Sequence, residues 1–236
     1  MATKQVTIDG IGVVSIYKRK GNRSIRLSIR PDGEVRVSIP TWLPYAAGVK
    51  FASSRADWIA QNRQAPPAAL AHGHRVGKAH RLSLEPHATD KVATRLDGNE
   101  IRISYPLTVR PEDKQVQAAA EKAAVRALKK EAESLLPQRL RDLAAQTGFH
   151  YSSVHVKRLK SRWGSCSSQQ EITLNLFLMQ LPWHLIDYVL LHELVHTKVM
   201  QHGAPFWDEF EKHLPNAKAR RREIRTHQPV LAPVSR

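Results

Sequence analysis

The segment WHLIDYVLLHELVHTKV, residues 183–199, constrains the fold of this chain more than any other part of the sequence. It is apolar nearly all round a helix, which is typical of a helix buried in a protein core. Pro182 stands just before it and suits the first turn of a helix, where a fixed φ and a missing N–H are tolerated. We therefore expect a buried helix here, with other elements packed around it.

The same helix carries chemical groups within HELVHTKVMQH, residues 192–202. Each residue of an α-helix advances by about 100°, so His192 and His196 lie about 40° apart around the axis and one turn apart along it. Both imidazoles can reach one metal ion, and Glu193 lies close enough to hold a water beside that ion. An unpartnered carboxylate on a buried helix would cost several kcal/mol. The pattern therefore predicts the metal site of a hydrolase.

A catalytic zinc ion usually has three protein ligands, and His202 is the candidate for the third. On an unbroken helix His202 would lie about 240° round from His196 and about 9 Å beyond it, so the helix must end first. A glycine and a proline just beyond His202 supply a stop. An acid on the next segment, Asp208 or Glu209, is the alternative ligand.

The first half of the chain alternates apolar and polar residues, which predicts strands. Residues 25–29 and 35–39 form one hairpin around Pro31-Asp32-Gly33, and residues 92–96 and 101–105 form another around Asp97-Gly98-Asn99. The spacing over residues 45–61 predicts a short helix that Pro66-Pro67 would stop, and we interpret AHGHRVGKAH, residues 71–80, as a polar loop.

The second half is richer in helix formers, and residues 112–146 predict two consecutive or kinked helices, interrupted at Pro137 and ended at Gly148. Strands are expected over 154–159 and 171–180. We therefore predict an α+β fold: a β-rich region, 1–106, with basic hairpins, followed by a helical domain, 107–236, with a β-hairpin before the HExxH helix. No internal repeat is evident.

Charge is the compositional outlier, with a net +16. Basic residues gather near both ends, and Arg26, Arg30 and Arg36 share one face of the first hairpin. Such a surface suits a nucleic acid or another polyanion, although solvated surface charge is the simpler account.

The single cysteine, Cys166, excludes an intrachain disulfide and agrees with a reducing compartment. The chain shows neither a secretory leader nor an apolar run long enough to span a membrane. We therefore expect a cytoplasmic protein without a membrane partner, and the sequence indicates no oligomeric state.

The segments KSRWGSCSS, ITLNLFLMQLP and DYVLLHELVHTKVMQHGAPFW, with their spacing, resemble the YgjP-like zinc metallohydrolases. This family is related in its site to the SprT-like DNA-repair proteases and is often grouped with the zincin peptidases. The resemblance implies a zincin-like domain that binds one zinc ion through His192, His196 and His202, with Glu193 as general base. Thr197 and Gln201 stand where the family commonly has leucine and asparagine. The histidine spacing also fits the metzincins, but Val199 occupies their glycine position.

The resemblance implies that zinc lowers the pKa of a bound water and that Glu193 takes the proton of this water. Polypeptides are the first substrate class. A nucleoside triphosphate pyrophosphatase using the same metal is one alternative, and a DNA-associated protease of the SprT-like kind is another.

Further candidates surround this site in the sequence. Arg162 and Ser165 could bind an anionic group of a substrate, whereas Trp163 suits the core. Tyr188, one turn before His192, is either a core residue or a candidate for contact with the transition state. The strand expected over residues 172–178 is either a core strand or one that aligns an extended peptide by edge pairing.

Overall fold

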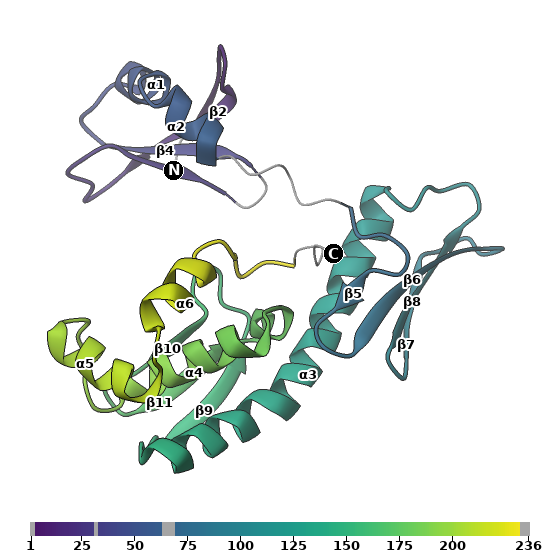
Figure 1. Cartoon of the computed structure of the whole chain (residues 1–236). Coiled ribbons are helices and arrows are strands. Elements are labelled where there is room, and N and C mark those ends of the chain that lie inside the picture. Colours follow the sequence, from purple (N-terminus) through teal and green to yellow (C-terminus); the bar gives the residue numbers. More distant parts are fainter. Residues whose placement is uncertain (1–2, 31–32, 63–68, 232–236) are drawn as a thin grey trace. The chain divides into compact units, whose positions relative to one another are not determined.

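The computed structural model describes residues 3–30, 33–62 and 69–231 (Figure 1). The chain divides into two compact units, Met1–Ala68 and Ala69–Arg236. The described residues form three small mixed sheets and six α-helices, an α+β fold whose C-terminal part is mainly helical. The predicted boundary at residue 106 separates mostly strands from mostly helices, but the sheet just before it packs on helix α3 within the second unit. As a domain boundary it stays a prediction.

The first unit is a four-stranded sheet covered on one face by two short helices. Its core joins Val14, Val35 and Ile59, all nearly inaccessible to solvent. The predicted hairpin is confirmed, although Pro31 and Asp32 of its turn, like Pro66-Pro67, lie outside the described residues. The elements are β1 (Thr3–Ile8), β2 (Gly12–Arg19), β3 (Arg26–Ile29), β4 (Val35–Pro40), α1 (Tyr45–Ser53) and α2 (Ala56–Asn62).

A second four-stranded sheet begins the other unit. The predicted hairpin around Gly98 is confirmed. The interpretation of residues 71–80 as a loop was wrong in part, because Val76 is buried in the core and its strand pairs with the strand that begins at His80. The strands are β5 (Arg75–Val76), β6 (His80–His87), β7 (Ala93–Asp97) and β8 (Glu100–Pro106).

These two sheets repeat one another, which the sequence reading missed. Their strand orders, β1-β2-β4-β3 and β5-β6-β8-β7, correspond, and each has a parallel central pair flanked by antiparallel pairs. The registers also agree, because Val14 pairs with Val35 where Leu82 pairs with Ile101. The last strands read EVRVSIP and EIRISYP. Each unit therefore contains a copy of one β-module.

Helix α3 (Lys114–Thr147) continues through Pro137 without a break, so of the two expectations, consecutive helices or a kinked one, the two separate helices are not formed. Proline removes one backbone donor, but Leu136 and Leu140 on either side are both inaccessible to solvent, so tertiary packing supports the helix across this point. The helix ends at Gly148 as predicted. This glycine has a φ of 73°, and its N–H donates to Ala144.

The elements after α3 surround the apolar helix that the sequence singled out. In the three-stranded sheet β10-β11-β9, β11 is the central strand. The strand expected to reach residue 180 ends at Asn175, because the Asn175 carboxamide accepts from Phe177 N and opens a 3₁₀ turn. The elements are β9 (Ser153–Lys157), β10 (Gly164–Cys166), β11 (Glu171–Asn175), η1 (Leu176–Gln180), α4 (Trp183–His196), α5 (Ala204–His213) and α6 (Ala217–Ile224). Among the described residues, no helix is both long enough and apolar enough to span a bilayer.

Glu131 joins α3 to the β5–β6 turn. Its carboxylate is buried and accepts two hydrogen bonds from Lys78 N, at 2.9 and 3.1 Å. Gly77 lies directly against it: the φ of Gly77 is 65°, and a Cβ there would stand 1.9 Å from Glu131 Oε2. The turn therefore requires glycine both for its conformation and for the space that the carboxylate occupies.

We expect Gly77→Ala to lower the free energy of unfolding by about 3 kcal/mol or more, because it adds left-handed strain and displaces a carboxylate that holds two hydrogen bonds. Gly98→Ala is the matched control. Gly98 has a φ of 57° but nothing within 4 Å of the added Cβ, so strain alone should cost about 1 kcal/mol. Urea unfolding of both variants measures the difference, and equal losses would contradict the role given to Glu131.

Candidate metal centre

Helix α4 presents His192, Glu193 and His196 from within the core. Glu193 and His196 are buried, and Leu190 and Leu194 of the same helix are inaccessible to solvent. The helix ends at His196, as it must if His202 is to approach the same point. The apolar faces of α4 thus fix the helix in the core, and its last turn supplies the polar groups.

The turn after α4 brings His202 back. His196 Nδ1 lies 3.1 Å from the Val199 carbonyl, and Gln170 Nε2 donates to the Thr197 carbonyl at 3.2 Å. Among the described non-glycine residues, only Gln170 and Asn216 have a positive φ. Val199 therefore sits in the turn without strain, and the metzincin glycine is not needed at this position.

The three imidazoles converge on one point. His192 Nε2 lies 3.2 Å from His196 Nε2 and 2.9 Å from His202 Nε2, and the last two nitrogens are 3.1 Å apart. Zinc–nitrogen bonds of about 2.0–2.1 Å place tetrahedral ligands at a similar separation. Because His196 Nδ1 can donate to the Val199 carbonyl, the lone pair of this ring is left on Nε2. These three donors could hold a metal ion.

Burial keeps the first two imidazoles neutral. It lowers the pKa of His192 to about 3, with help from the charges of His196, His202 and Arg221. The pKa of His196 is also lowered, mainly by burial. Neutral imidazole is the form that binds metals, so the electrostatics favour ligand chemistry over ion pairing.

Phe206 supports the imidazoles from the core side. Its ring is inaccessible to solvent, and its centroid lies 4.8, 4.6 and 4.9 Å from those of His192, His196 and His202. The first turn of α5, which contains Pro205, places this ring there. The segment GAPFW therefore positions the histidines by packing.

Glu193 lies against the backbone of β10. A Cβ added to Gly164 would stand 2.7 Å from Glu193 Oε1 and 2.9 Å from its Cγ. Burial raises the pKa of Glu193 to about 8, and the charge of Arg162 opposes the rise. The glycine of RWGSC makes the room for this carboxylate.

The strand with a free edge near the site is β10, because β11 pairs with β10 on one side and with β9 on the other. The idea that residues 172–178 align a peptide by edge pairing is therefore wrong for the central strand. Among the described residues, β10 pairs with β11 alone. Glu193 lies against the face of this edge strand, at Gly164.

Three further residues that the sequence singled out are Arg162, Ser165 and Glu209. The Arg162 charge acts on Glu193, but alternation along β10 puts the Ser165 side chain on the face opposite that of Gly164. Anion binding by these two residues stays a prediction. Glu209, weighed as a third ligand, accepts from Lys198 and Lys212, both at 2.7 Å. These hydrogen bonds lower its pKa to about 2.

Arg221 is a candidate site residue that the sequence reading treated only as part of a basic run. Its guanidinium lies 4.6 Å from the centroid of the Trp207 ring, and that ring lies 6.3 Å from the ring of His192. No sequence motif marked Arg221, since its place depends on how α6 packs beside α4.

Tyr188 is buried and packs against Phe210, as a core residue does.

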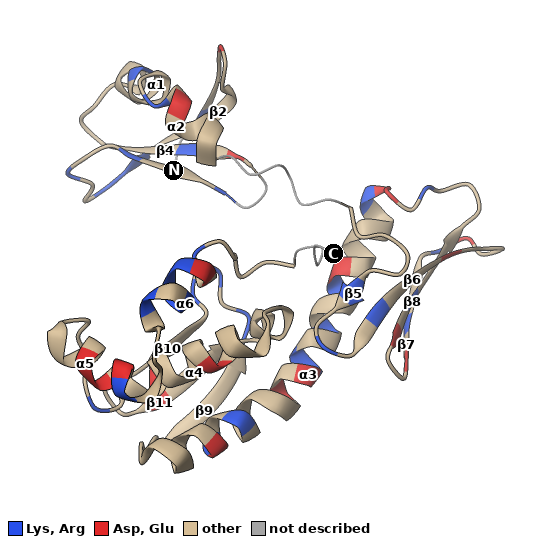
Figure 2. Ribbon diagram, in the orientation of Figure 1, with Lys and Arg blue, Asp and Glu red and all other residues tan. Residues whose placement is uncertain are grey.

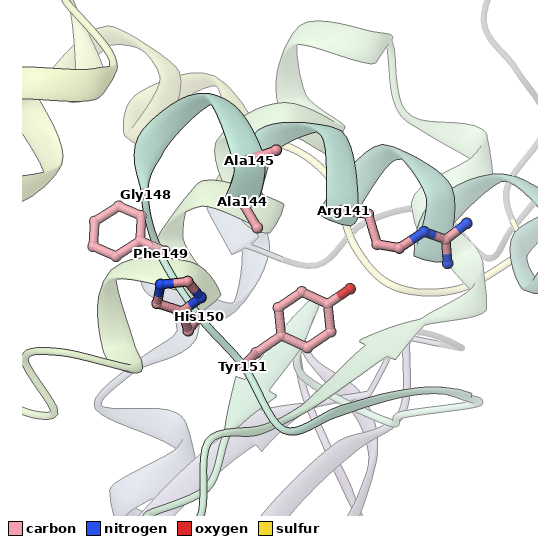
Figure 3. A pocket seen from close by; sticks show the side chains of 7 residues that line it. All are labelled: Arg141, Ala144, Ala145, Gly148, Phe149, His150 and Tyr151. Carbon is pink, nitrogen blue, oxygen red and sulfur yellow. The ribbon is translucent and has the colours of Figure 1, made fainter.

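A hollow at the end of α3 is separate from the histidines (Figure 3). It measures about 390 Å³, and the Tyr151 ring lies between the Arg141 and His150 side chains in this view. Burial raises the pKa of Tyr151, and the charge of Arg141 opposes the rise. The lining contains none of the candidate ligands and consists of Arg141, Ala144, Ala145, Gly148, Phe149, His150 and Tyr151.

The half-buried thiol of Cys166 has a raised pKa, of about 11, caused by burial and by the negative charge of Glu193. Because the thiolate is the reactive form, alkylation by iodoacetamide should accelerate about tenfold per pH unit from pH 7 to about 10. In the urea-unfolded chain the rate should level off above about pH 9, near the ordinary thiol pKa of about 8.5. A folded-state profile that levels off with the unfolded one would contradict this.

Comparison with known proteins places these features in a family. Residues 23–227 match the family described as "YgjP-like, metallopeptidase domain". The chain is also similar to the crystal structures of two metallopeptidase zymogens. Pyrococcus abyssi abylysin is 28% identical, with 39% of this chain and 93% of that one covered and a TM-score of 0.36. Methanocaldococcus jannaschii jannalysin is 21% identical, with 39% and 92% covered and a TM-score of 0.34. No curated protein matches. The chain belongs to the YgjP-like metallopeptidase family.

Proposed function

We propose that the chain is a zinc-dependent metallopeptidase with a zincin-like catalytic domain. The observation that carries the proposal is the triangle of Nε2 atoms from His192, His196 and His202, 2.9–3.2 Å apart, at the end of the helix that also carries the buried Glu193. Family membership supports a hydrolase that acts on polypeptides. Three imidazole donors suit zinc, and they also suit copper, iron or nickel, so metal analysis is part of the test.

When bound, zinc supplies Lewis-acid polarisation of the peptide carbonyl and activates water for attack. The three histidines would hold the ion. Glu193 would orient the attacking water, take its proton and deliver that proton to the leaving amine. Its buried carboxylate, held against Gly164, is shielded from bulk water and fixed in direction.

The free edge of β10 is the part of the fold that suits an extended substrate. A peptide added to this edge would run beside Gly164 and therefore beside Glu193, with its carbonyls near the histidines. Arg162 supplies positive charge on the side of Glu193, and Arg221 supplies it on the side of His192. Both charges favour the negative charge that develops on the carbonyl oxygen. The single cysteine supports action in the cytoplasm.

The decisive variant is Glu193→Gln, which keeps the shape of the side chain and removes the base. We expect cleavage of an unfolded protein such as casein to fall at least about 100-fold, with one metal ion still bound per chain. His196→Ala should lose both the metal and the cleavage. Elemental analysis and a gel-based cleavage assay measure the two properties.

His213→Ala is the matched control, since this histidine packs on Phe149 and lies outside the triad. It should keep the metal and the activity. A wild-type chain without stoichiometric metal would refute the metal site. A chain that spares casein but hydrolyses nucleoside triphosphates, with the same dependence on Glu193, would replace the peptidase by the pyrophosphatase alternative.

Gly164→Ala tests the contact between β10 and Glu193. Its added Cβ would stand 2.7 Å from Glu193 Oε1, so the carboxylate must move. A displacement of about 1 Å can cost about 100-fold in rate, and we expect a loss of this size with the metal retained. Gly203→Ala is the control, because its Cβ would meet only Pro205 Cδ at 3.5 Å. Similar activities of the two variants would contradict the role of Gly164.

A further inference from the structure

The two copies of the β-module present different outer faces. In each copy the inner face of the sheet packs on helices, and alternation along the strands assigns the other side chains to the outer face. Ser15 and Arg36 of the first sheet occupy the register positions of Ser83 and Arg102 in the second. Equivalent positions of the two sheets can therefore be compared to separate residues that the fold requires from residues that only one sheet has.

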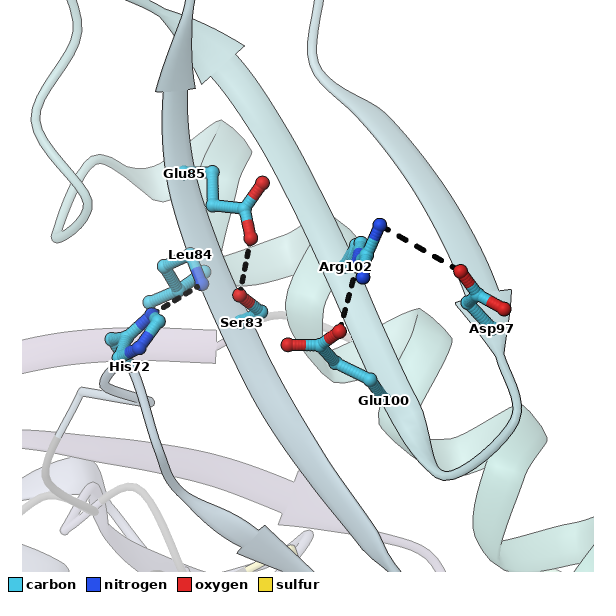
Figure 4. Close-up of polar contacts among 7 residues, drawn as sticks. All are labelled: His72, Ser83, Leu84, Glu85, Asp97, Glu100 and Arg102. Carbon is cyan, nitrogen blue, oxygen red and sulfur yellow. Dashed lines mark hydrogen bonds and ion pairs between the residues drawn. The ribbon is translucent and has the colours of Figure 1, made fainter.

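Carboxylates accompany Arg102 on the second outer face (Figure 4). Arg102 Nε donates to Glu100 at 2.8 Å, and Arg102 also pairs with Asp97 at 3.6 Å. Ser83 donates to Glu85 at 2.6 Å. Acids thus accompany the arginines of this sheet, and Figure 2 shows both colours along β6, β7 and β8.

The first outer face has cations at the corresponding positions. Where the second copy has His87 opposite Pro106, the first has Arg19 opposite Pro40. Arg26 replaces Ala93, since these residues pair with Ser38 and Ser104. Arg30, whose backbone bonds to Glu34 across the hairpin, stands where the second sheet has Asp97. At one position the first sheet has less positive charge than the second, because Ser28 stands where the second has Arg95.

Most of this positive charge is available to a partner. Arg19 and Arg26 are exposed and form no ion pair with a described acid. Glu34 is shared between Arg30 at 3.2 Å and Arg36 at 3.9 Å, and it also accepts from Ser15. One carboxylate therefore serves two guanidinium groups on this face.

Aromatic side chains accompany the cations. Tyr17 stands where the second copy has Glu85, and the Arg36 guanidinium lies 4.8 Å from the centroid of its ring. Trp42, just beyond β4, is 73% exposed. A planar apolar side chain exposed to water suits stacking on nucleobases, whereas an acidic peptide would use only the charge.

We propose that the outer face of the sheet β1-β2-β4-β3 binds single-stranded nucleic acid, with Arg19, Arg26 and Arg30 on phosphates and Trp42 on a base. An open sheet with cations and an exposed aromatic ring can receive unstacked bases on its surface. The proposal does not depend on the peptidase activity.

The test uses the full chain and a fluorescein-labelled single-stranded oligonucleotide, with binding followed by anisotropy over a range of salt concentrations. Arg26→Ala with Arg30→Asp gives the first sheet the residues of the second. Arg81→Ala with Arg95→Asp removes the same charge from the outer face of the second sheet. The first pair should weaken binding at least tenfold. It should also make the slope of log binding constant against log salt concentration shallower by about 1.4, because two phosphate contacts are lost at about 0.7 each.

The control pair should change affinity less than about threefold. Trp42→Ala should weaken binding about fivefold or more at an unchanged salt slope, because stacking releases no counterions. Equal losses from both charge-reversing pairs, or no wild-type binding at low salt, would overturn the proposal. So would a duplex or a poly-glutamate chain that binds as tightly as the single strand. The metal content and casein cleavage of these variants should not change, so this result is separable from the fate of the peptidase proposal.

Discussion

The approach of the Glu193 carboxylate to the backbone at Gly164 is the constraint on which the site depends. A buried carboxylate costs several kcal/mol unless polar partners or a metal site compensate, and Glu193 is 5% exposed. The apolar packing of α4 cannot provide such compensation, but it fixes the direction of the side chain. Gly164 of the edge strand β10 has no side chain, so the carboxylate can lie directly against the backbone there. The helix, the strand and the turn that carries His202 thus act as one unit.

The parts of the candidate site that lie on one helix could be derived from the sequence. His192, Glu193 and His196 follow from helix geometry, and the need for α4 to end before His202 follows from the same rise per residue. The turn itself could not be derived, because it is held partly by a residue distant in sequence, Gln170, which donates to the Thr197 carbonyl. Arg221 was missed for a related reason: its position depends on tertiary packing.

Strand assignments were right where alternation and a glycine turn coincide, as around Gly98. They failed where a side chain redirects the backbone. At Asn175 the carboxamide bonds to the Leu159 and Arg162 carbonyls and to Phe177 N, which converts the end of an apolar strand into a 3₁₀ turn. The free edge then falls to β10, a short strand that periodicity cannot reveal in three residues.

The repeated β-module shows why a structural repeat can be hard to see in the sequence and plain in the structure. Its parallel central pair joins strands separated by a crossover, so the shared register cannot be read from local pattern. For both sheets to pack, only the volume of the buried apolar side chains and a few buried polar residues, such as Ser15 and its equivalent Ser83, need to be similar. The outer faces are free to diverge, and differences concentrated there, such as Arg30 in place of Asp97, are not required by folding. Surface charge that the equivalent copy lacks is thus better explained by a partner than by the needs of the scaffold.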